Sequence, residues 1–304
     1  MMKKNLIVIL GPTASGKTRL GVRLAAELGS EIISADSRQV YRGMDLGTGK
    51  DLSEYRLSGK TIACHLIDII DPEEEFNLFE YQKRFYQVFG ALHDKGILPV
   101  MVGGTGLYLE AVLAGYVLPE AKPDERLRRE LAGKSMDELR AQLLALKPEL
   151  HNKTDLEDRG RLIRKIEVEL ARKKHGEAKK QNPLIDACVF GIRCPRDLLR
   201  KKISERLSHR LKTGLVEEVA ALHARGLSWE RLDSFGLEYR YLARYLQKKM
   251  TWEEMAYGLE IVIGQFAKRQ MTWFRRMEKK GIHIEWVEAD GYDLLRDRAM
   301  ELLH

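Results

Sequence analysis

The sequence has little cysteine and no long hydrophobic run. Its three cysteines, Cys64, Cys188 and Cys194, are odd in number and form no C-x-x-C pair. This pattern argues against a disulfide framework and against a cysteine zinc site. Lys3 and Lys4 precede only five apolar residues, too few for the core of a signal peptide, and no later run is long enough to span a membrane. We therefore expect a cytoplasmic chain with reduced thiols and no membrane partner.

Proline is also scarce, at eight of 304 residues, and no internal repeat or low-complexity tract is present. A hydrophobic content of 44% and a charged content of 32% are typical of a globular protein, and the length suggests about two domains. The net charge of +7 is unevenly spread, because residues 193–280 hold 20 Lys and Arg against 11 Asp and Glu. Such a segment suits a polyanion partner, although charge alone fits ordinary solvated helix faces better.

A phosphate-binding loop is present near the start of the chain. The segment GPTASGKT at 11–18 follows the apolar run 6–10 and matches G-x-x-x-x-G-K-[ST], the loop type of ATP-binding and other nucleotide-binding proteins. Its glycines allow successive backbone N–H groups to face phosphate oxygens, and the next helix adds the positive end of its dipole. The Thr18 hydroxyl is the expected Mg²⁺ ligand. The expected diphosphate-binding residues are Gly11, Thr13, Ala14, Ser15, Gly16, Lys17 and Thr18.

Short β-type runs alternate with helical patterns in the first 115 residues, which predicts an α/β fold with a P-loop NTPase-like parallel sheet flanked by helices. The expected strands are residues 6–10, 32–35, 61–67 and 97–102, with a later strand at 185–192. The expected helices are residues 18–28, 78–93 and 107–114.

A charged, helical stretch interrupts this pattern and predicts two domains. Residues 1–115 and 183–304 would form the P-loop α/β core with C-terminal helices, and residues 116–182 a small all-helical insertion domain. Within the insertion, residues 135–138 (SMDE) form a capping box and 158–174 a helix. A second capping box at 251–254 begins a long helix with the apolar stripe Trp252, Met255, Leu259, Ile263 and Phe266, while its polar residues Lys268, Thr272, Arg275 and Lys279 share another face.

Three polar residues follow predicted strands, where open α/β sheets bind ligands. Asp36 follows the second strand, and it is either a metal ligand, a general base or simply an Asx-turn residue. Thr105 lies in the GGTG segment after the fourth strand. Asp68 has a Walker-B-like position, although a carboxylate there is also common in turns and helix caps.

Taken together, these segments resemble those of the tRNA dimethylallyltransferases, also called tRNA isopentenyltransferases, the IPP transferase family. The resemblance extends to about residue 276. The matching segments are GPTASGKT at 11–18, SADSRQVYRGMDLGTGK at 34–50, HLID at 65–68, GGTGLY at 103–108, RLIR at 161–164 with Glu167, and AKRQMTWFR at 267–275.

The resemblance implies a prenyltransferase, active in tRNA modification, that moves a dimethylallyl group from dimethylallyl diphosphate to N6 of the adenosine next to the anticodon (position 37). The loop would then hold the diphosphate of the prenyl donor, with Mg²⁺, rather than the triphosphate of ATP. The implied partners are dimethylallyl diphosphate and the tRNA anticodon stem-loop, which the insertion domain at 116–182 would contact, and the implied state is a monomer. The implied catalytic residues are Asp36, Lys17 and Thr105, and the implied tRNA-binding residues are Asp36, Ser37, Arg38, Gln39, Thr105, Arg161, Arg164, Lys268, Arg269 and Gln270.

Several positions depart from the family pattern and indicate a divergent member. The chain has Gly236-Leu237-Glu238-Tyr239 in place of Gly-Tyr-Arg-Gln, with Arg240 nearby, and Gly264 in place of the arginine before Gln265. Gly160 also stands where an arginine or glutamine is common. Three alternatives remain open: an adenylate dimethylallyltransferase that prenylates free AMP, ADP or ATP, a P-loop small-molecule kinase, and an RNA-binding protein that has lost catalysis.

Overall fold

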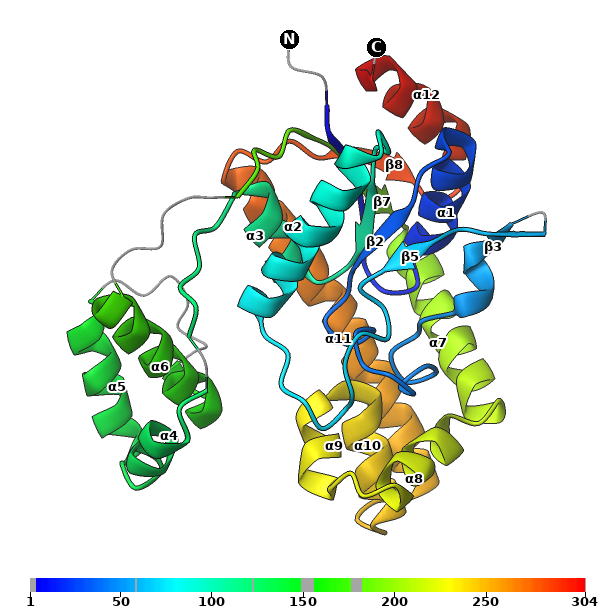
Figure 1. The fold of residues 1–304 in the computed structure, drawn as a ribbon. Coiled ribbons are helices and arrows are strands. Elements are labelled where there is room, and N and C mark those ends of the chain that lie inside the picture. The colour runs from blue at the N-terminus through cyan, green and yellow to red at the C-terminus, as the bar shows by residue number, and fades with distance from the viewer. Residues whose placement is uncertain (1–3, 58, 122, 149–155, 176–181, 304) are drawn as a thin grey trace. The chain divides into compact units, whose positions relative to one another are not determined.

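The computed structural model describes residues 4–57, 59–121, 123–148, 156–175 and 182–303 (Figure 1). The chain divides into two compact units, one formed by residues 1–115 with 183–304 and the other by residues 116–182. Among the described residues, no helix is long and apolar enough to cross a membrane.

A six-stranded parallel sheet lies at the centre of the larger unit, which confirms the predicted α/β class. Its strand order is β5-β2-β6-β1-β7-β8, and every neighbouring pair is parallel. The central strand β1 is fully buried, which explains its unbroken apolar sequence. The strands are β1 (Leu6–Leu10), β2 (Ile32–Ala35), β5 (Cys64–His65), β6 (Val100–Gly103), β7 (Ala187–Arg193) and β8 (Glu285–Glu288).

Helices cover both faces of this sheet (Figure 1). Side chains alternate along β1, so Leu6, Val8 and Leu10 join one core while Ile7 and Ile9 join the other. The first core is completed by α2 (Leu78–Asp94), α3 (Gly106–Leu113) and the C-terminal half of α11 (Trp252–Lys279). The second is completed by α1 (Lys17–Leu28) and α12 (Tyr292–Leu303).

A further core lies among the C-terminal helices. It joins α7 (Arg196–Lys212), α8 (Leu215–Ala224), α9 (Trp229–Phe235), α10 (Leu237–Leu246) and the N-terminal half of α11. The capping box at Thr251 is confirmed, and Met255, Leu259 and Ile263 are buried as predicted. Trp252 is not a core residue, because it lies in the first turn of α11 and remains 40% exposed. Figure 1 shows α11 running from these helices to the sheet.

The smaller unit consists of helices in its described part. These are α4 (Glu125–Ala132), α5 (Met136–Leu146) and α6 (Arg159–His175). Ser135 begins α5 with the predicted capping box, in which its side chain accepts from the Glu138 N–H and Glu138 accepts in return. The core of this unit contains Leu131, Leu139, Leu143, Leu162 and Ile166.

The prediction of a single strand at 61–67 is wrong. The 3-10 helix η1 (Leu52–Tyr55) is followed by β3 (Arg56–Leu57), which pairs antiparallel with β4 (Lys60–Thr61), and only Cys64–His65 join the main sheet as β5. The strand ends there because Leu66 and Asp68 have φ angles of 64° and 54°, outside the extended region.

One other strand has a different boundary, and one strand is missing from the prediction. Strand β6 begins at Val100 rather than at residue 97, because Pro99 lacks an N–H group and contributes only its carbonyl to the sheet, accepting from Ile7. Strand β8 was not predicted at all. Its signal is the alternation of Ile282, Ile284 and Trp286 with polar residues.

Candidate active site

The phosphate loop connects β1 to α1 in a conformation that leaves the helix N-terminus uncapped. Ala14 and Gly16 have φ angles of 61° and 85°, which curl the backbone back before α1 begins at Lys17. Gly16 makes no side-chain cap, so the first N–H groups of α1 remain available to an anion. Ser15 is buried, and its Oγ has no hydrogen-bond partner. The loop therefore presents unsatisfied donors at the carboxyl edge of the sheet.

Lys17 is the cation of this loop, and its Nζ donates to the Pro12 carbonyl at 3.3 Å. Burial and, after it, repulsion from Arg206 lower the pKa of Lys17 to about 8, with partial compensation from Asp36, Glu54 and Asp51. Its charged ammonium group is therefore disfavoured by burial and by a neighbouring cation, and a bound anion would stabilise it.

Asp36 lies directly after β2, on the same sheet edge. Its Oδ1 accepts from the N–H groups of Arg38 and Gln39 at 2.8 and 3.3 Å, so the Asx turn among the sequence-based readings is present. Both bonds end on Oδ1. Within the described part of the chain, the other carboxylate oxygen, Oδ2, has no hydrogen bond. The turn therefore orients the carboxylate and still leaves an oxygen to accept a proton.

Thr105 connects the ends of β2 and β6. It occupies the N-cap position of α3 but does not cap it, because its Oγ1 accepts from the Ser37 N–H at 3.0 Å. Its own N–H donates to the Ala35 carbonyl at 3.1 Å. Thr105 and Asp36 are therefore brought to neighbouring turns on one sheet edge, next to the phosphate loop.

Gln270 lies beside the phosphate loop, but it is buried and its side chain bonds to protein groups. It is 6% exposed, its Oε1 accepts from the Thr13 N–H at 2.8 Å, and its Nε2 donates to the Gly104 carbonyl at 2.9 Å. The Thr13 N–H is thus already used by a side chain from α11. Gln270 therefore braces the loop, and both its amide oxygen and its amide nitrogen are hydrogen-bonded within the protein.

Two other residues expected to touch RNA also make contacts inside the protein. Gln39 donates from Nε2 to the Gly49 carbonyl at 3.0 Å. Arg38 is partly buried, its guanidinium lies 5.5 Å from the Phe235 ring centroid, and burial lowers its pKa. Both residues belong to the turn that begins at Asp36, so contacts within the protein fix the conformation of this turn beside the carboxylate.

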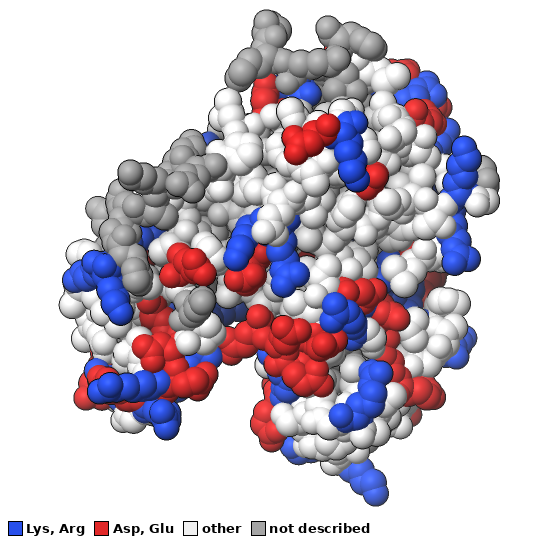
Figure 2. Space-filling model, viewed as in Figure 1, with Lys and Arg blue, Asp and Glu red and all other residues white. Residues whose placement is uncertain are grey.

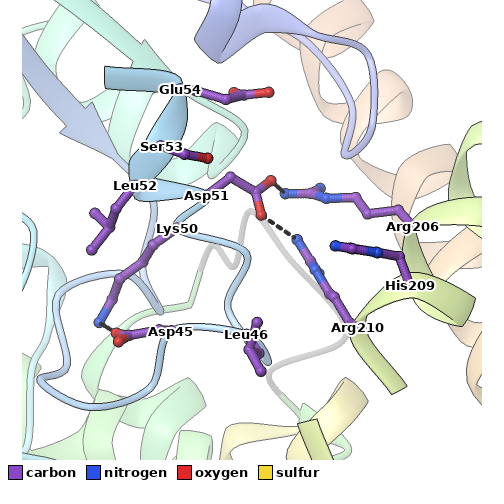
Figure 3. Close-up of a pocket in the computed structure, with 10 residues that line it drawn as sticks. All are labelled: Asp45, Leu46, Lys50, Asp51, Leu52, Ser53, Glu54, Arg206, His209 and Arg210. Carbon is purple, nitrogen blue, oxygen red and sulfur yellow. Dashed lines mark hydrogen bonds and ion pairs between the residues drawn. The ribbon is translucent and has the colours of Figure 1, made fainter. Parts of the chain in front are cut away.

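Sequence reasoning missed a charged group contributed by α7. Arg206 and Arg210 both point toward Asp51 (Figure 3), with Arg210 Nη2 at 3.4 Å from Asp51 Oδ1 and Arg206 bonded to Oδ2. Arg206 Nη1 also lies 3.4 Å from the Thr13 Oγ1 of the phosphate loop. The group lines a pocket of about 530 Å³ together with Asp45, Leu46, Lys50, Leu52, Ser53, Glu54 and His209.

The loop that carries Asp51 is held by two further charged contacts. Lys50 is buried and donates to the Tyr41 carbonyl at 2.8 Å and to Asp45 at 2.6 Å, and it is also paired with Asp68. The Walker-B-like position of Asp68 is thus used in an ion pair. The Glu218 carboxylate accepts from three successive backbone N–H groups, those of residues 45, 46 and 47, at 2.7–3.0 Å.

The residues at the divergent positions have defined partners. Glu238 is buried, and its carboxylate lies 3.9 Å from Arg210 Nη1. Burial raises the pKa of Glu238, and Arg210 partly offsets the rise. Arg240 is paired with Asp233 at 3.1 Å. A Cβ added at Gly264 would have no neighbour within 4 Å, so a side chain fits there.

The expected RNA-binding cations of α11 lie in solvent. Lys268 and Arg269 are exposed, as are Thr272, Arg275 and Lys279 on the polar face of the helix. Figure 2 shows acidic side chains gathered on the larger unit over the connection from β5 to α2, which carries the exposed residues Asp71, Glu73, Glu74 and Glu75.

In the smaller unit, Arg161 and Arg164 differ in environment. Arg161 is exposed. Arg164 donates to Glu167 at 3.0 Å and to the Ala121 carbonyl at 2.7 Å, so its guanidinium serves the structure of this unit. Arg161 is therefore the better placed of the two to reach a phosphate.

Comparisons with known proteins identify the family. A sequence model described as IPP transferase matches residues 39–277, and one described as Isopentenyl transferase matches residues 4–64. The chain is 56% identical to tRNA dimethylallyltransferase 1 of Syntrophus aciditrophicus (strain SB) over 98% of each protein.

Solved structures agree with this match. The full-length tRNA isopentenylpyrophosphate transferase from Bacillus halodurans is 31% identical, with a TM-score of 0.72 over 99% of this chain and 97% of that one. A eukaryotic dimethylallyltransferase acting on tRNA, 22% identical, shares the fold with a TM-score of 0.76 over 94% of this chain and 74% of that one. The chain belongs to the IPP transferase family.

Proposed function

We propose that this chain transfers a dimethylallyl group from dimethylallyl diphosphate to N6 of the adenosine next to the tRNA anticodon (position 37), releasing diphosphate. The observation that carries the proposal is the position of Asp36 beside Lys17, because a base and a diphosphate-binding cation then share one sheet edge. The names of the relatives support transfer to tRNA rather than to a free nucleotide. In this proposal the enzyme acts as a monomer in the cytoplasm.

The phosphate loop stabilises the leaving group. As the carbon–oxygen bond of the donor breaks, negative charge grows on the diphosphate, and the free N–H groups before α1 and the Lys17 ammonium are suited to accept it. Lys17 is already destabilised as a cation by burial and by Arg206, so it gains from the arriving charge. The loop thus stabilises the transition state, in which the diphosphate carries more negative charge, more than it stabilises the bound donor.

Asp36 acts on the nucleophile. The exocyclic N6 amine forms the new bond to the allylic carbon, and the proton that it loses passes to the Asp36 carboxylate. The Asx turn orients Oδ1 and leaves Oδ2 for this transfer. The Thr105 hydroxyl accepts from the Ser37 N–H and donates to the Ser37 Oγ across 3.4 Å, and this long bond leaves its hydrogen able to turn toward a substrate instead.

Mg²⁺ fits this site as a partner of the diphosphate. The described residues contain no cluster of three His, Cys, Asp or Glu that would bind a metal by itself. The Thr18 hydroxyl, in the first turn of α1, would be the protein's ligand for a Mg²⁺ ion that arrives with the diphosphate. When bound, it neutralises charge on the leaving diphosphate.

The RNA must deliver an unstacked base. An adenine that is stacked in the anticodon loop cannot reach Asp36, so the target nucleotide flips into the site. The exposed cations Lys268, Arg269 and Arg161 then bind the RNA backbone. Since these contacts are electrostatic, binding weakens as salt rises.

A transfer assay tests the proposal. Purified protein is incubated with Mg²⁺ and dimethylallyl diphosphate carrying a label in its dimethylallyl group, with unmodified tRNA in one reaction and AMP in another. Label is expected in tRNA only, and Asp36→Asn should slow its incorporation about 10²- to 10⁴-fold. Label in AMP only would assign the chain to free nucleotides, and label in neither would refute prenyl transfer.

A further inference from the structure

A buried ion pair lies where the chain departs from the family pattern. Glu238 stands in place of the arginine of Gly-Tyr-Arg-Gln, lies in the first turn of α10 and is buried. Its carboxylate is 3.9 Å from Nη1 of Arg210, which comes from α7. The position that holds a cation in the pattern therefore holds an anion here, and a cation from another helix reaches the same place.

Arg240, the arginine that follows Glu238 most closely in sequence, does not fill this place. It lies two residues further along α10, about 200° round the helix, so its side chain leaves the helix on the opposite side. Its guanidinium is paired with Asp233 at 3.1 Å, and its side chain is 43% exposed. The side chains of Arg210 and Glu238, in contrast, are both buried. Arg210 rather than Arg240 is thus the cation that meets position 238.

Arg210 also contacts the loop that adjoins the Asp36 turn. Its Nη2 donates to Asp51 Oδ1 at 3.4 Å, and a Cβ added at Gly49 would overlap the same nitrogen. The Gly49 carbonyl in turn accepts from Nε2 of Gln39 at 3.0 Å. Gln39 belongs to the turn that begins at Asp36, since its N–H donates to the Asp36 carboxylate. The Arg210 guanidinium therefore packs against the backbone that fixes the Gln39 side chain.

The stability of the fold does not by itself account for this charged pair. Within the described residues, Nε of Arg210 is buried without a hydrogen-bond partner. Burial lowers the pKa of Arg210 and raises the pKa of Glu238, so it disfavours the charged form of each, and the attraction between them offsets only part of this. Apolar residues of similar volume often stabilise a protein as well as a buried ion pair, or better.

We propose that Arg210 supplies from α7 the cation that the family pattern has at position 238, with Glu238 as its counter-ion, and that Arg210 is a positioning residue of the active site. It acts through Gly49 and Gln39 on the turn that carries Asp36. The inference rests on the proposed function, because its activity readout is prenyl transfer to tRNA.

The competing explanation is that the pair only completes the packing of α7 against α10. The two explanations differ when the cation is moved from one helix to the other. If the site needs a guanidinium at this place, an arginine at position 238 can supply it, because the side chain there already reaches Arg210. If the pair is only a packing contact, moving the cation can restore stability but does not restore the rate.

Moving the cation between the helices is therefore the test. Arg210→Leu should slow single-turnover transfer to tRNA about 10- to 100-fold, the effect of one charge-assisted hydrogen bond. It should also lower the melting temperature, because Glu238 is left buried without a cation. Adding Glu238→Arg to this variant should raise the rate again by about tenfold or more and restore the melting temperature, because a guanidinium returns to the same place. Glu238→Arg alone should lower both, because it brings two buried cations together.

Arg240→Leu is the matched control, since it makes the same change at an exposed cation of α10, and it should leave the transfer rate unchanged. A larger loss of rate from Arg240→Leu than from Arg210→Leu would overturn the inference. So would no gain in rate when Glu238→Arg is added to Arg210→Leu, even if the melting temperature recovers.

Failure of the proposed function is distinguishable from failure of this inference. Absence of transfer by the unchanged protein would refute the proposed function. The melting temperatures would then decide whether the cation can be moved: recovery in the double variant supports the relocation from position 238 to Arg210, and no recovery overturns it.

Discussion

The Gln270 side chain joins Thr13 of the phosphate loop to the turn after β6. Its Oε1 accepts from the Thr13 N–H at 2.8 Å, while its Nε2 donates to the Gly104 carbonyl at 2.9 Å. A Cβ at Gly104 would lie 2.3 Å from this amide nitrogen, so glycine is required for the close approach. The long helix α11 therefore holds together two loops that are far apart in sequence.

Replacing Gln270 should destabilise the protein. Gln270→Met keeps the length of the side chain but leaves a buried N–H at Thr13 and a carbonyl at Gly104 without partners. The free energy of unfolding should fall by about 1–3 kcal/mol in urea denaturation. Gln265→Met is the control, because Gln265 is exposed on the same helix and should change stability by less than about 0.5 kcal/mol.

Asp36→Asn should preserve the turn after β2 and slow prenyl transfer. The amide oxygen of Asn still accepts from Arg38 and Gln39, so the turn and the melting temperature should be preserved. The rate of prenyl transfer should fall about 10²- to 10⁴-fold, because no base remains to take the N6 proton. Single-turnover kinetics measure this, and a rate near that of the unchanged protein would eliminate Asp36 as the base.

The activity should fall on the alkaline side as Lys17 loses its charge. A lysine is cationic below its pKa, and the pKa of Lys17 is lowered to about 8 mainly by burial and then by Arg206. The kcat/KM for dimethylallyl diphosphate, which reports the free enzyme, should therefore decline as pH rises through about 8.

Arg206→Gln should shift this alkaline limb to higher pH. Removing the Arg206 charge removes a repulsion, so Lys17 holds its proton more tightly. The groups that raise the pKa of Lys17, namely Asp36, Glu54 and Asp51, remain in place. The pH profile of the variant would contradict this account if its limb stayed fixed or moved to lower pH.

Gly264→Ala should stabilise the protein. Gly264 lies within the helix α11, and a Cβ there would meet nothing within 4 Å beyond its own turns of the helix backbone. Alanine loses less backbone entropy on folding, so the free energy of unfolding should rise by about 0.5–1 kcal/mol. A lower melting temperature for Gly264→Ala would contradict this prediction, because it would mean that the added methyl group clashes with a neighbouring group.

The two arginines of α6 should behave differently when replaced. Arg161→Gln removes an exposed charge, so it should leave stability unchanged, weaken tRNA binding and reduce the salt slope by about one. Arg164→Gln removes bonds to buried Glu167 and to the Ala121 carbonyl, so it should lower the melting temperature of the protein. Equal effects of both variants on tRNA affinity, without a change in stability, would contradict this division.

Much of the fold follows from local sequence signals. The apolar run at 6–10 predicts a buried central strand, and the capping boxes at Ser135 and Thr251 predict the starts of α5 and α11. These signals work because each depends on neighbouring residues alone. The segment 61–67 is ambiguous for the same reason, since its apolar residues do not reveal the left-handed turn at Leu66.

The sequence by itself determined the phosphate loop, the positions of Asp36 and Thr105 after their strands, and the α/β class, because each is written in consecutive residues. Only the tertiary structure decided that Arg206 and Asp51 meet beside Thr13 and that Gln270 is used inside the protein. Those contacts join segments more than a hundred residues apart, and chain topology rather than local pattern brings such segments together.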